Sequence, residues 1–166
     1  YDSAAYYFEK AMELYERMGD DKPLGGVYSN LAISYLMQSN YPQALLYQQK
    51  ALKVAREQKN RTSQAYTLMN MGSTYQNLKD TIHSEESFLA GIEMAKSESL
   101  LNVELYGYSN ISSLYFDQGK WDKSYEFAMK ASSLAEELGD QSIKAASLAK
   151  ASLTLLKVEK FHEADS

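Results

Sequence analysis

Apolar residues recur along the chain at the spacing of an amphipathic helix. One stripe consists of Tyr28, Leu31, Ala32 and Tyr35, and a second consists of Ala44, Tyr47, Ala51 and Val54. Residues three and four positions apart share one face of a helix, so each stripe predicts a helix with one buried side. The polar pair Ser39-Asn40 lies between the stripes, and residues 21–60 are therefore predicted to form two helices.

The same pattern returns every forty residues. The counterparts of the first stripe are Leu68, Met71, Gly72 and Tyr75, then Tyr108, Ile111, Ser112 and Tyr115, and finally Leu148, Ala151, Ser152 and Leu155. Further breaks between helices are expected near Lys79-Asp80 and Gly119-Lys120. A fixed period of this length indicates a repeat protein, in which helix pairs stack on one another because no single pair can bury its apolar face alone.

The residue types within each period suit close helix packing. A small residue at Ala32, Gly72 or Ser112 should let the partner helix approach, while a large ring three residues later fills the space beside it. Turn residues also fit this division. Gly19-Asp20 and Gly139-Asp140 each combine a helix-ending glycine with a candidate N-cap, Asn60 is a further candidate cap, and Pro23 is expected near a first helical turn.

These residues resemble the tetratricopeptide repeat. Tyr28-x2-Leu31-Ala32-x2-Tyr35 with Ala44 follows its signature, and so do Gly72, Tyr75 and Phe88. The period exceeds the usual length of about thirty-four residues, and the closing proline is replaced by Arg56, Lys96 and Glu136. The chain is thus similar to the longer-repeat branch found in kinesin light chains and bacterial peptide-sensing or histidine-kinase regulators. The resemblance implies an all-α, right-handed helical-repeat solenoid.

One solenoid domain is expected over residues 1–166. It divides into a half repeat at 1–20, full repeats at 21–60, 61–100 and 101–140, and a partial repeat at 141–166, in which a second helix is expected to begin at residue 161. We interpret the chain as a fragment of a longer protein, because neither end resembles a polar cap. Tyr7, Phe8 and Ala11 would then lack their partner helix, and weak self-association through the ends is expected.

The first helices of successive repeats should line the binding groove. The residues expected there are Asn30, Tyr66, Asn70, Ser73, Asn77, Tyr106, Asn110 and Ser113. The resemblance implies that Asn30, Asn70 and Asn110 form a ladder that holds a peptide backbone. The alternative is that each asparagine bonds a neighbouring helix and only sets the spacing. Basic residues facing the groove are limited to Lys150 and Lys157, so an uncharged or mixed peptide is favoured over an acidic one.

Composition narrows the function further. The net charge of −5 argues against nucleic-acid binding, and no apolar run is long enough to span a membrane. Without cysteine, and with His83 and His162 far apart, neither a catalytic site nor a metal site is expected, and no cofactor is implied. The absence of cysteine is compatible with the cytoplasm and the periplasm alike. We therefore expect a protein- or peptide-binding module, in a sensory or regulatory role, with a structural scaffold as the alternative.

Overall fold

The computed structural model describes residues 2–164, with side chains described for residues 4–159. All eight elements in this range are helices, which confirms the expected all-α helical-repeat class. They are α1 (Asp2–Met18), α2 (Leu24–Met37), α3 (Tyr41–Glu57), α4 (Arg61–Asn77), α5 (Thr81–Ser97), α6 (Leu101–Asp117), α7 (Trp121–Glu137) and α8 (Gln141–Ala164).

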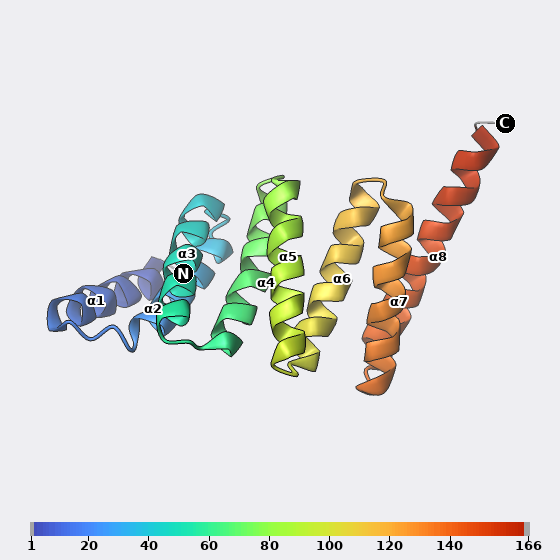
Figure 1. Ribbon diagram of the computed structural model, residues 1–166. Helices are drawn as coiled ribbons and strands as arrows, with labels where there is room; N and C mark the ends of the chain where they lie inside the picture. The colour runs from blue at the N-terminus through green and yellow to red at the C-terminus, as the bar shows by residue number, and fades with distance from the viewer. Residues whose placement is uncertain (1, 165–166) are drawn as a thin grey trace. The chain divides into compact units, whose positions relative to one another are not determined.

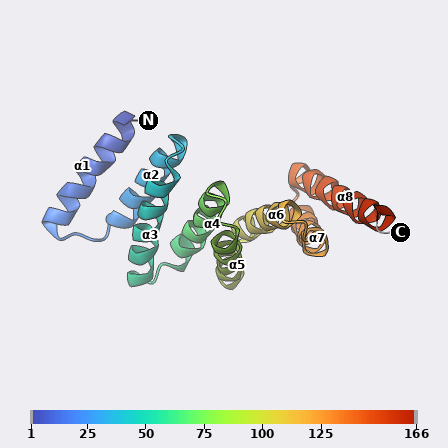
Figure 2. The same cartoon turned by 90° about the horizontal axis from the view of Figure 1, so that it is seen from above.

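The chain divides into two compact units, residues 1–98 and 99–166. In the first unit, α1 packs against α2, α2 against α3, α3 against α4 and α4 against α5 (Figures 1 and 2). In the second unit, α6 packs against α7 and α7 against α8, while α8 also touches α6. The helix breaks predicted near residues 39, 79 and 119 are confirmed. The expectation of one continuous solenoid stays a prediction.

Most helices end in the same left-handed turn. Positive φ angles occur at residues twenty apart: Gly19, Ser39, Lys59, Lys79, Ser99, Gly119 and Gly139. The backbone N–H of the residue that follows donates a hydrogen bond to the carbonyl five positions earlier and so closes the end of the helix. An example is Asn60 N to Ala55 O at 2.9 Å. Glycine adopts this conformation without a steric penalty, whereas serine and lysine adopt it at some cost.

Side-chain caps begin several of the next helices. Asn60 Oδ1 accepts from Ser63 N at 2.9 Å, and Asp140 Oδ1 accepts from Ile143 N at 2.9 Å, so both predicted caps are confirmed. The prediction for Asp20 is wrong. Its carboxylate accepts from Lys22 N in a local turn, and α2 begins only at Leu24, with Pro23 in the cap position.

The prediction that a second helix begins at residue 161 is also wrong. Helix α8 runs without a break from Gln141 to Ala164. The two residues at the expected turn are Glu159 and Lys160, and neither favours a left-handed turn or caps a helix. The repeat pattern predicted a boundary there, but the local sequence keeps the helix going.

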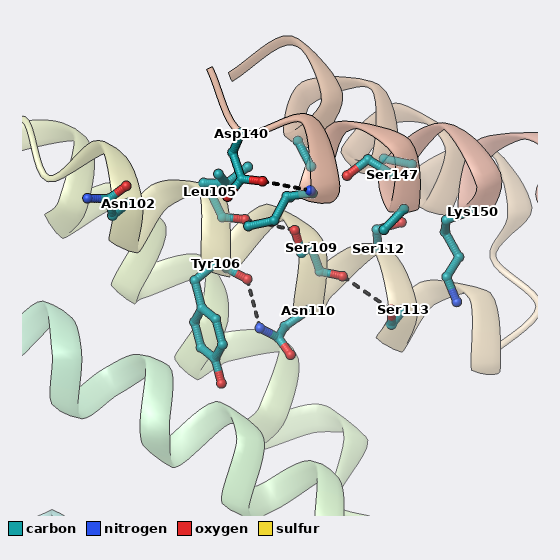
Figure 3. A pocket seen from close by; sticks show the side chains of 14 residues that line it. Asn102, Leu105, Tyr106, Ser109, Asn110, Ser112, Ser113, Asp140, Ser147 and Lys150 are labelled. Carbon is teal, nitrogen blue, oxygen red and sulfur yellow. Dashed lines mark hydrogen bonds between the residues drawn. The ribbon is translucent and has the colours of Figure 1, made fainter. Parts of the chain in front are cut away.

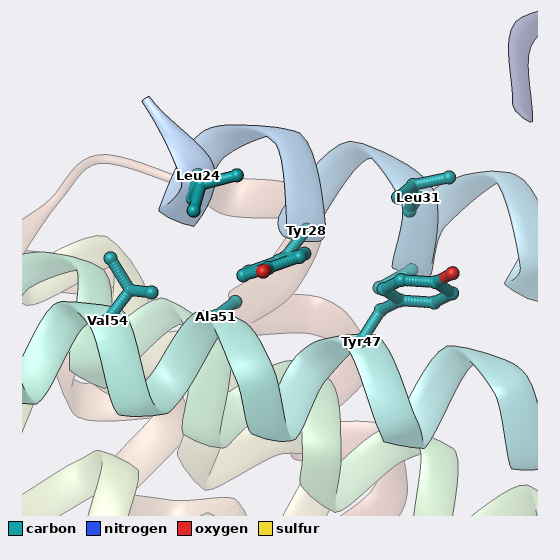
Figure 4. Packing of buried hydrophobic residues seen from close by; sticks show 7 residues of the cluster. Leu24, Tyr28, Leu31, Tyr47, Ala51 and Val54 are labelled. Carbon is teal, nitrogen blue, oxygen red and sulfur yellow. The ribbon is translucent and has the colours of Figure 1, made fainter. Parts of the chain in front are cut away.

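The core of the first unit lies where the repeat pattern places it. Leu24, Tyr28 and Leu31 of α2 face Tyr47, Ala51 and Val54 of α3, as Figure 4 shows. The rings of Tyr35 and Tyr47 stack with centroids 5.6 Å apart. Phe8 of α1 packs against the same cluster, which corrects the expectation that it lacks a partner, whereas Tyr7 is 71% exposed.

The small residues of the repeat are contact points between paired helices. A Cβ atom on Gly72 would lie only 2.6 Å from Cδ1 of Phe88 in α5, and Ser84 Oγ donates to the Gly72 carbonyl. In the second unit, Ser112 and Ser124 each donate a hydroxyl hydrogen bond to the carbonyl of the other, at 2.9 and 3.0 Å. Close approach through small residues, as predicted, is therefore the rule in both units.

The last copy of the apolar stripe differs from the others. Ala151 is buried, but Leu148 and Leu155 are 41% and 48% exposed, contrary to their predicted place in the core. In α8 the buried residues are instead Ser147, Ala151 and Thr154, and Thr154 Oγ1 lies 3.3 Å from Ser124 Oγ of α7. The exposed leucines lie on a side of α8 that no described helix covers. Self-association through such faces stays a prediction.

Two tyrosines connect α1 to α2 through carboxylates. Tyr35 Oη donates to Glu9 at 2.7 Å. This hydrogen bond is the main cause, and burial the second cause, that raises the pKa of Tyr35 to about 12. For Tyr28, burial is the main cause that raises the pKa to about 12, and the second cause is the hydrogen bond that its Oη donates to Glu16 at 3.1 Å. Both bonds need the protonated phenol, and therefore belong to the neutral-pH structure.

These contacts predict alkaline instability. A pKa that is higher in the folded than in the unfolded chain gives stability that is complete below about pH 10 and is lost as the pH rises towards 12. The free energy of unfolding, measured by urea titration, should therefore fall across this range. The fall should be smaller in Tyr35→Phe and unchanged in a control, Tyr66→Phe, whose side chain is 53% exposed. Equal slopes in all three proteins would contradict the assignment.

Candidate functional site

The predicted groove residues lie on the first helices of the helix pairs. In the first unit, α2 carries Asn30 and α4 carries Tyr66, Asn70, Ser73 and Asn77. All of these are exposed except Ser73, which is half-buried. In the second unit, α6 carries Tyr106, Asn110 and Ser113. Tyr106 is 45% exposed, and the other two are half-buried.

Three of these residues meet in one cavity of the second unit. Tyr106, Asn110 and Ser113 line a hollow of about 490 Å³ between α6, α7 and α8, shown from close by in Figure 3. The other lining residues are Asn102, Leu105, Ser109, Ser112, Ala128, Ala131, Asp140, Ile143, Ala146, Ser147 and Lys150. The cavity is large enough to take a side chain of a ligand.

The walls of this cavity are mainly apolar and its α6 side is polar. Leu105, Ala128 and Ala131 are buried, and Ile143 is half-buried beside them. On α6, Ser109 Oγ donates to the Leu105 carbonyl and Ser113 Oγ donates to the Ser109 carbonyl. Since those hydroxyl protons are used within the helix, the serine oxygens can act towards a ligand as acceptors.

Asn110 bonds its own helix. Its Nδ2 atom donates to the Tyr106 carbonyl at 2.7 Å (Figure 3). A carboxamide has two N–H donors and one acceptor oxygen, so one donor and the acceptor remain for a ligand. The partner seen here is neither a ligand nor a neighbouring helix, and the peptide-binding role of the asparagines stays a prediction.

Two charged residues border the cavity. The Asp140 carboxylate caps α8 through Ile143 N, which places it at the start of that helix. Lys150 lies on α8 with its ammonium 4.6 Å from the centroid of the Phe116 ring, a cation–π contact. Lys150 therefore supplies a positive charge to a largely neutral site.

A smaller cavity lies in the first unit. It measures about 130 Å³ and is lined by Ser29, Ala32, Ile33, Leu36, Gln48, Ala51, Thr67 and Asn70 from α2, α3 and α4. Of the predicted site residues only Asn70 contributes to it. Asn30, Tyr66, Ser73 and Asn77 lie outside both cavities.

The sequence-based prediction missed the second-helix contribution to both cavities. Gln48 in α3 and Ala128 in α7 occupy the same repeat position. Both are buried, and each lines the cavity of its unit described above. The available signal was the change of residue type at this position, from Gln48 to Phe88 to Ala128. A small residue where its counterparts are large indicates missing volume.

Other kinds of site find no support in the part of the chain that is described. It contains no group of three or more histidine, cysteine, aspartate or glutamate residues that could hold a metal ion. Its helices also include none long and apolar enough to cross a membrane.

The helix pairs and their packing define an all-α helical-repeat protein. The family model for the tetratricopeptide repeat matches residues 1–57 and 23–97. The chain therefore belongs to the tetratricopeptide repeat family. Comparison with curated proteins gave no match.

Several solved structures share the fold. The apo form of RapI matches with a TM-score of 0.86 at 16% identity, over 98% of this chain and 45% of that one. A signal-transduction ATPase with a tetratricopeptide repeat sensor, from Pyrococcus horikoshii, matches with a TM-score of 0.83 at 19% identity, over 96% and 26%. Aspartyl phosphate phosphatase F from Bacillus subtilis matches with a TM-score of 0.76 at 20% identity, over 97% and 49%. The chain thus spans half or less of these proteins.

Proposed function

We propose that this chain is a peptide- or protein-recognition module in the sensory or regulatory part of a longer bacterial protein. Tetratricopeptide repeats generally mediate protein–protein interaction. The observation that supports a peptide ligand is the cavity of the second unit, where Tyr106, Asn110 and Ser113 border an apolar hollow. Polar groups along one helix can bond a peptide backbone while the hollow takes a side chain.

The sensory role draws support from the similar structures. One of them is described as having a tetratricopeptide repeat sensor, and another is an aspartyl phosphate phosphatase. The shared fold is compatible with such a role, and the site chemistry fits a neutral or mixed peptide better than a strongly acidic one. A structural scaffold with one constant partner is the alternative function.

The proposal is tested by selecting peptides from a displayed library against the chain. Selected peptides should lose affinity about fivefold in the variant Asn110→Ala, because its amide is expected to contribute about 1 kcal/mol of hydrogen bonding. The binding is measured by calorimetry.

The matched control is Gln49→Ala with Glu93→Ala. Both residues are exposed on the second helices α3 and α5, and affinity should not change. Equal affinity for the chain and the asparagine variant, with folding intact by circular dichroism, would place the peptide elsewhere. Failure to select any peptide would count against the function itself.

A sensor and a scaffold also differ in their response to ligand. Small-angle scattering should show a change of shape when a selected peptide saturates the chain, since a ligand that favours one conformation shifts the population towards it. An unchanged profile would favour the scaffold.

A further inference from the structure

The cavities of the two units occupy the same place in the repeat. The first-unit residues Ser29, Gln48 and Asn70 correspond to Ser109, Ala128 and Lys150, which lie eighty residues (two periods) further along the chain. Each cavity lies between two first helices and the second helix that separates them in sequence. In the first unit this place holds two smaller cavities, the one of about 130 Å³ and another of about 220 Å³ that shares Ser29, Ala51 and Thr67 with it. In the second unit it holds a single cavity of about 490 Å³.

One difference between the two places is the residue on the intervening helix, which is Gln48 in α3 and Ala128 in α7. Gln48 is only 3% exposed, and its Nε2 donates to Thr74 Oγ1 at 2.9 Å, so its side chain occupies space between the helices. Its Oε1 is buried without a hydrogen-bond partner among the described residues. Ala128, 1% exposed, ends at Cβ and lines the single larger cavity of the second unit.

We propose that the cavity of the second unit is an anchor pocket for one bulky apolar side chain, of leucine, methionine or phenylalanine, in the bound peptide. In this inference, which rests on the proposed function, Ala128 is the residue that determines specificity. Leu105, Ala128 and Ile143 offer an apolar wall, and an apolar side chain gains affinity when such a wall removes it from water. Asn110, beside the wall, keeps a donor and an acceptor for the backbone next to the anchor.

The chain contains its own blocking residue for a test. In Ala128→Gln the new side chain would extend towards Thr154, the counterpart of Thr74. The Thr154 hydroxyl donates to the Lys150 carbonyl, as that of Thr74 donates to the Asn70 carbonyl, and its oxygen lies 3.3 Å from Ser124 Oγ. Ser112 and Ala131, the counterparts of Ala32 and Ala51, keep the surroundings small. The variant should therefore fold, because Gln48 already occupies this environment in the first unit.

The first readout uses small probes. N-acetyl-phenylalaninamide, titrated into the ¹⁵N-labelled chain, should shift the amide signals of Ala128, Ala131 and Ile143 in a saturable manner. N-acetyl-alaninamide should not, because it has no bulky group to bury. Ala128→Gln should weaken binding of the phenylalanine probe at least tenfold.

The results that overturn the inference are distinct. Equal binding of the two probes, shifts confined to other residues, or full affinity in Ala128→Gln would show that the cavity is no apolar anchor pocket.

The inference and the proposed function can fail separately. A selected peptide that keeps its affinity in Ala128→Gln would overturn the anchor pocket and leave peptide recognition standing. Conversely, if the probes behave as expected but no library peptide binds, the proposed function fails and the preference of the cavity for apolar groups stands.

Discussion

Replacing Phe88 with alanine should lower the free energy of unfolding by about 3–5 kcal/mol, the usual cost of removing a buried aromatic ring. Phe88 is fully buried, and its ring fills the space that Gly72 leaves between α4 and α5. The loss has two parts: the favourable free energy of burying the ring away from water is forfeited, and the cavity left behind adds a further cost. Urea titration followed by circular dichroism measures it.

The control for this prediction lies on the same helix. Ile82 in α5 is 69% exposed, and Ile82→Ala should change the free energy of unfolding by no more than about 0.5 kcal/mol. If the two variants are equally stable, then the contact between α4 and α5 is not the main source of stability in this unit.

Period and residue type together predicted most of the fold. The spacing of Tyr28, Leu31 and Ala32 predicts a helix whatever its neighbours are, and repetition at forty residues predicts the partner on which it packs. Gly72 could be interpreted as a close-contact position because its counterparts are also small. These features are local or strictly periodic, so one sequence suffices to detect them.

The wrong predictions arose where periodicity was extended beyond its local support. Residues 159–160 lack the turn-forming types found at Ser39-Asn40, and α8 accordingly continues through them. Leu148 and Leu155 have the apolar character of the stripe, but burial depends on a helix that packs against them, and no described helix does so.

The candidate site was only partly predictable. Tyr106, Asn110 and Ser113 were found because they lie on one side of one helix, a property of sequence spacing alone. The contribution of Ala128 is the absence of a side chain on another helix, and its effect depends on how α6, α7 and α8 pack. A pattern of first-helix residues contains no information about that volume.

Replacing Gly72 with alanine should lower the free energy of unfolding by about 1–3 kcal/mol, although the same change usually stabilises a helix. Alanine is favoured over glycine in a helix by about 1 kcal/mol, because it loses less backbone entropy on folding. At Gly72, however, the added methyl group would lie 2.6–2.9 Å from three atoms of the Phe88 ring. Since that ring is buried on all sides, the helices must separate or the ring must leave its preferred position.

Gly26 provides the opposite case. It lies within α2, and a Cβ atom added there would meet nothing within 4 Å. Gly26→Ala should therefore raise the free energy of unfolding by about 0.5–1 kcal/mol.

In the Phe88→Ala background, Gly72→Ala should also lose most of its cost, because the ring that it meets is gone. If Gly72→Ala lowers and Gly26→Ala raises the free energy of unfolding, and if the first effect depends on Phe88, the cost at Gly72 comes from the contact between α4 and α5. If Gly72→Ala stabilises the protein instead, the close approach of α4 and α5 is not required by the fold.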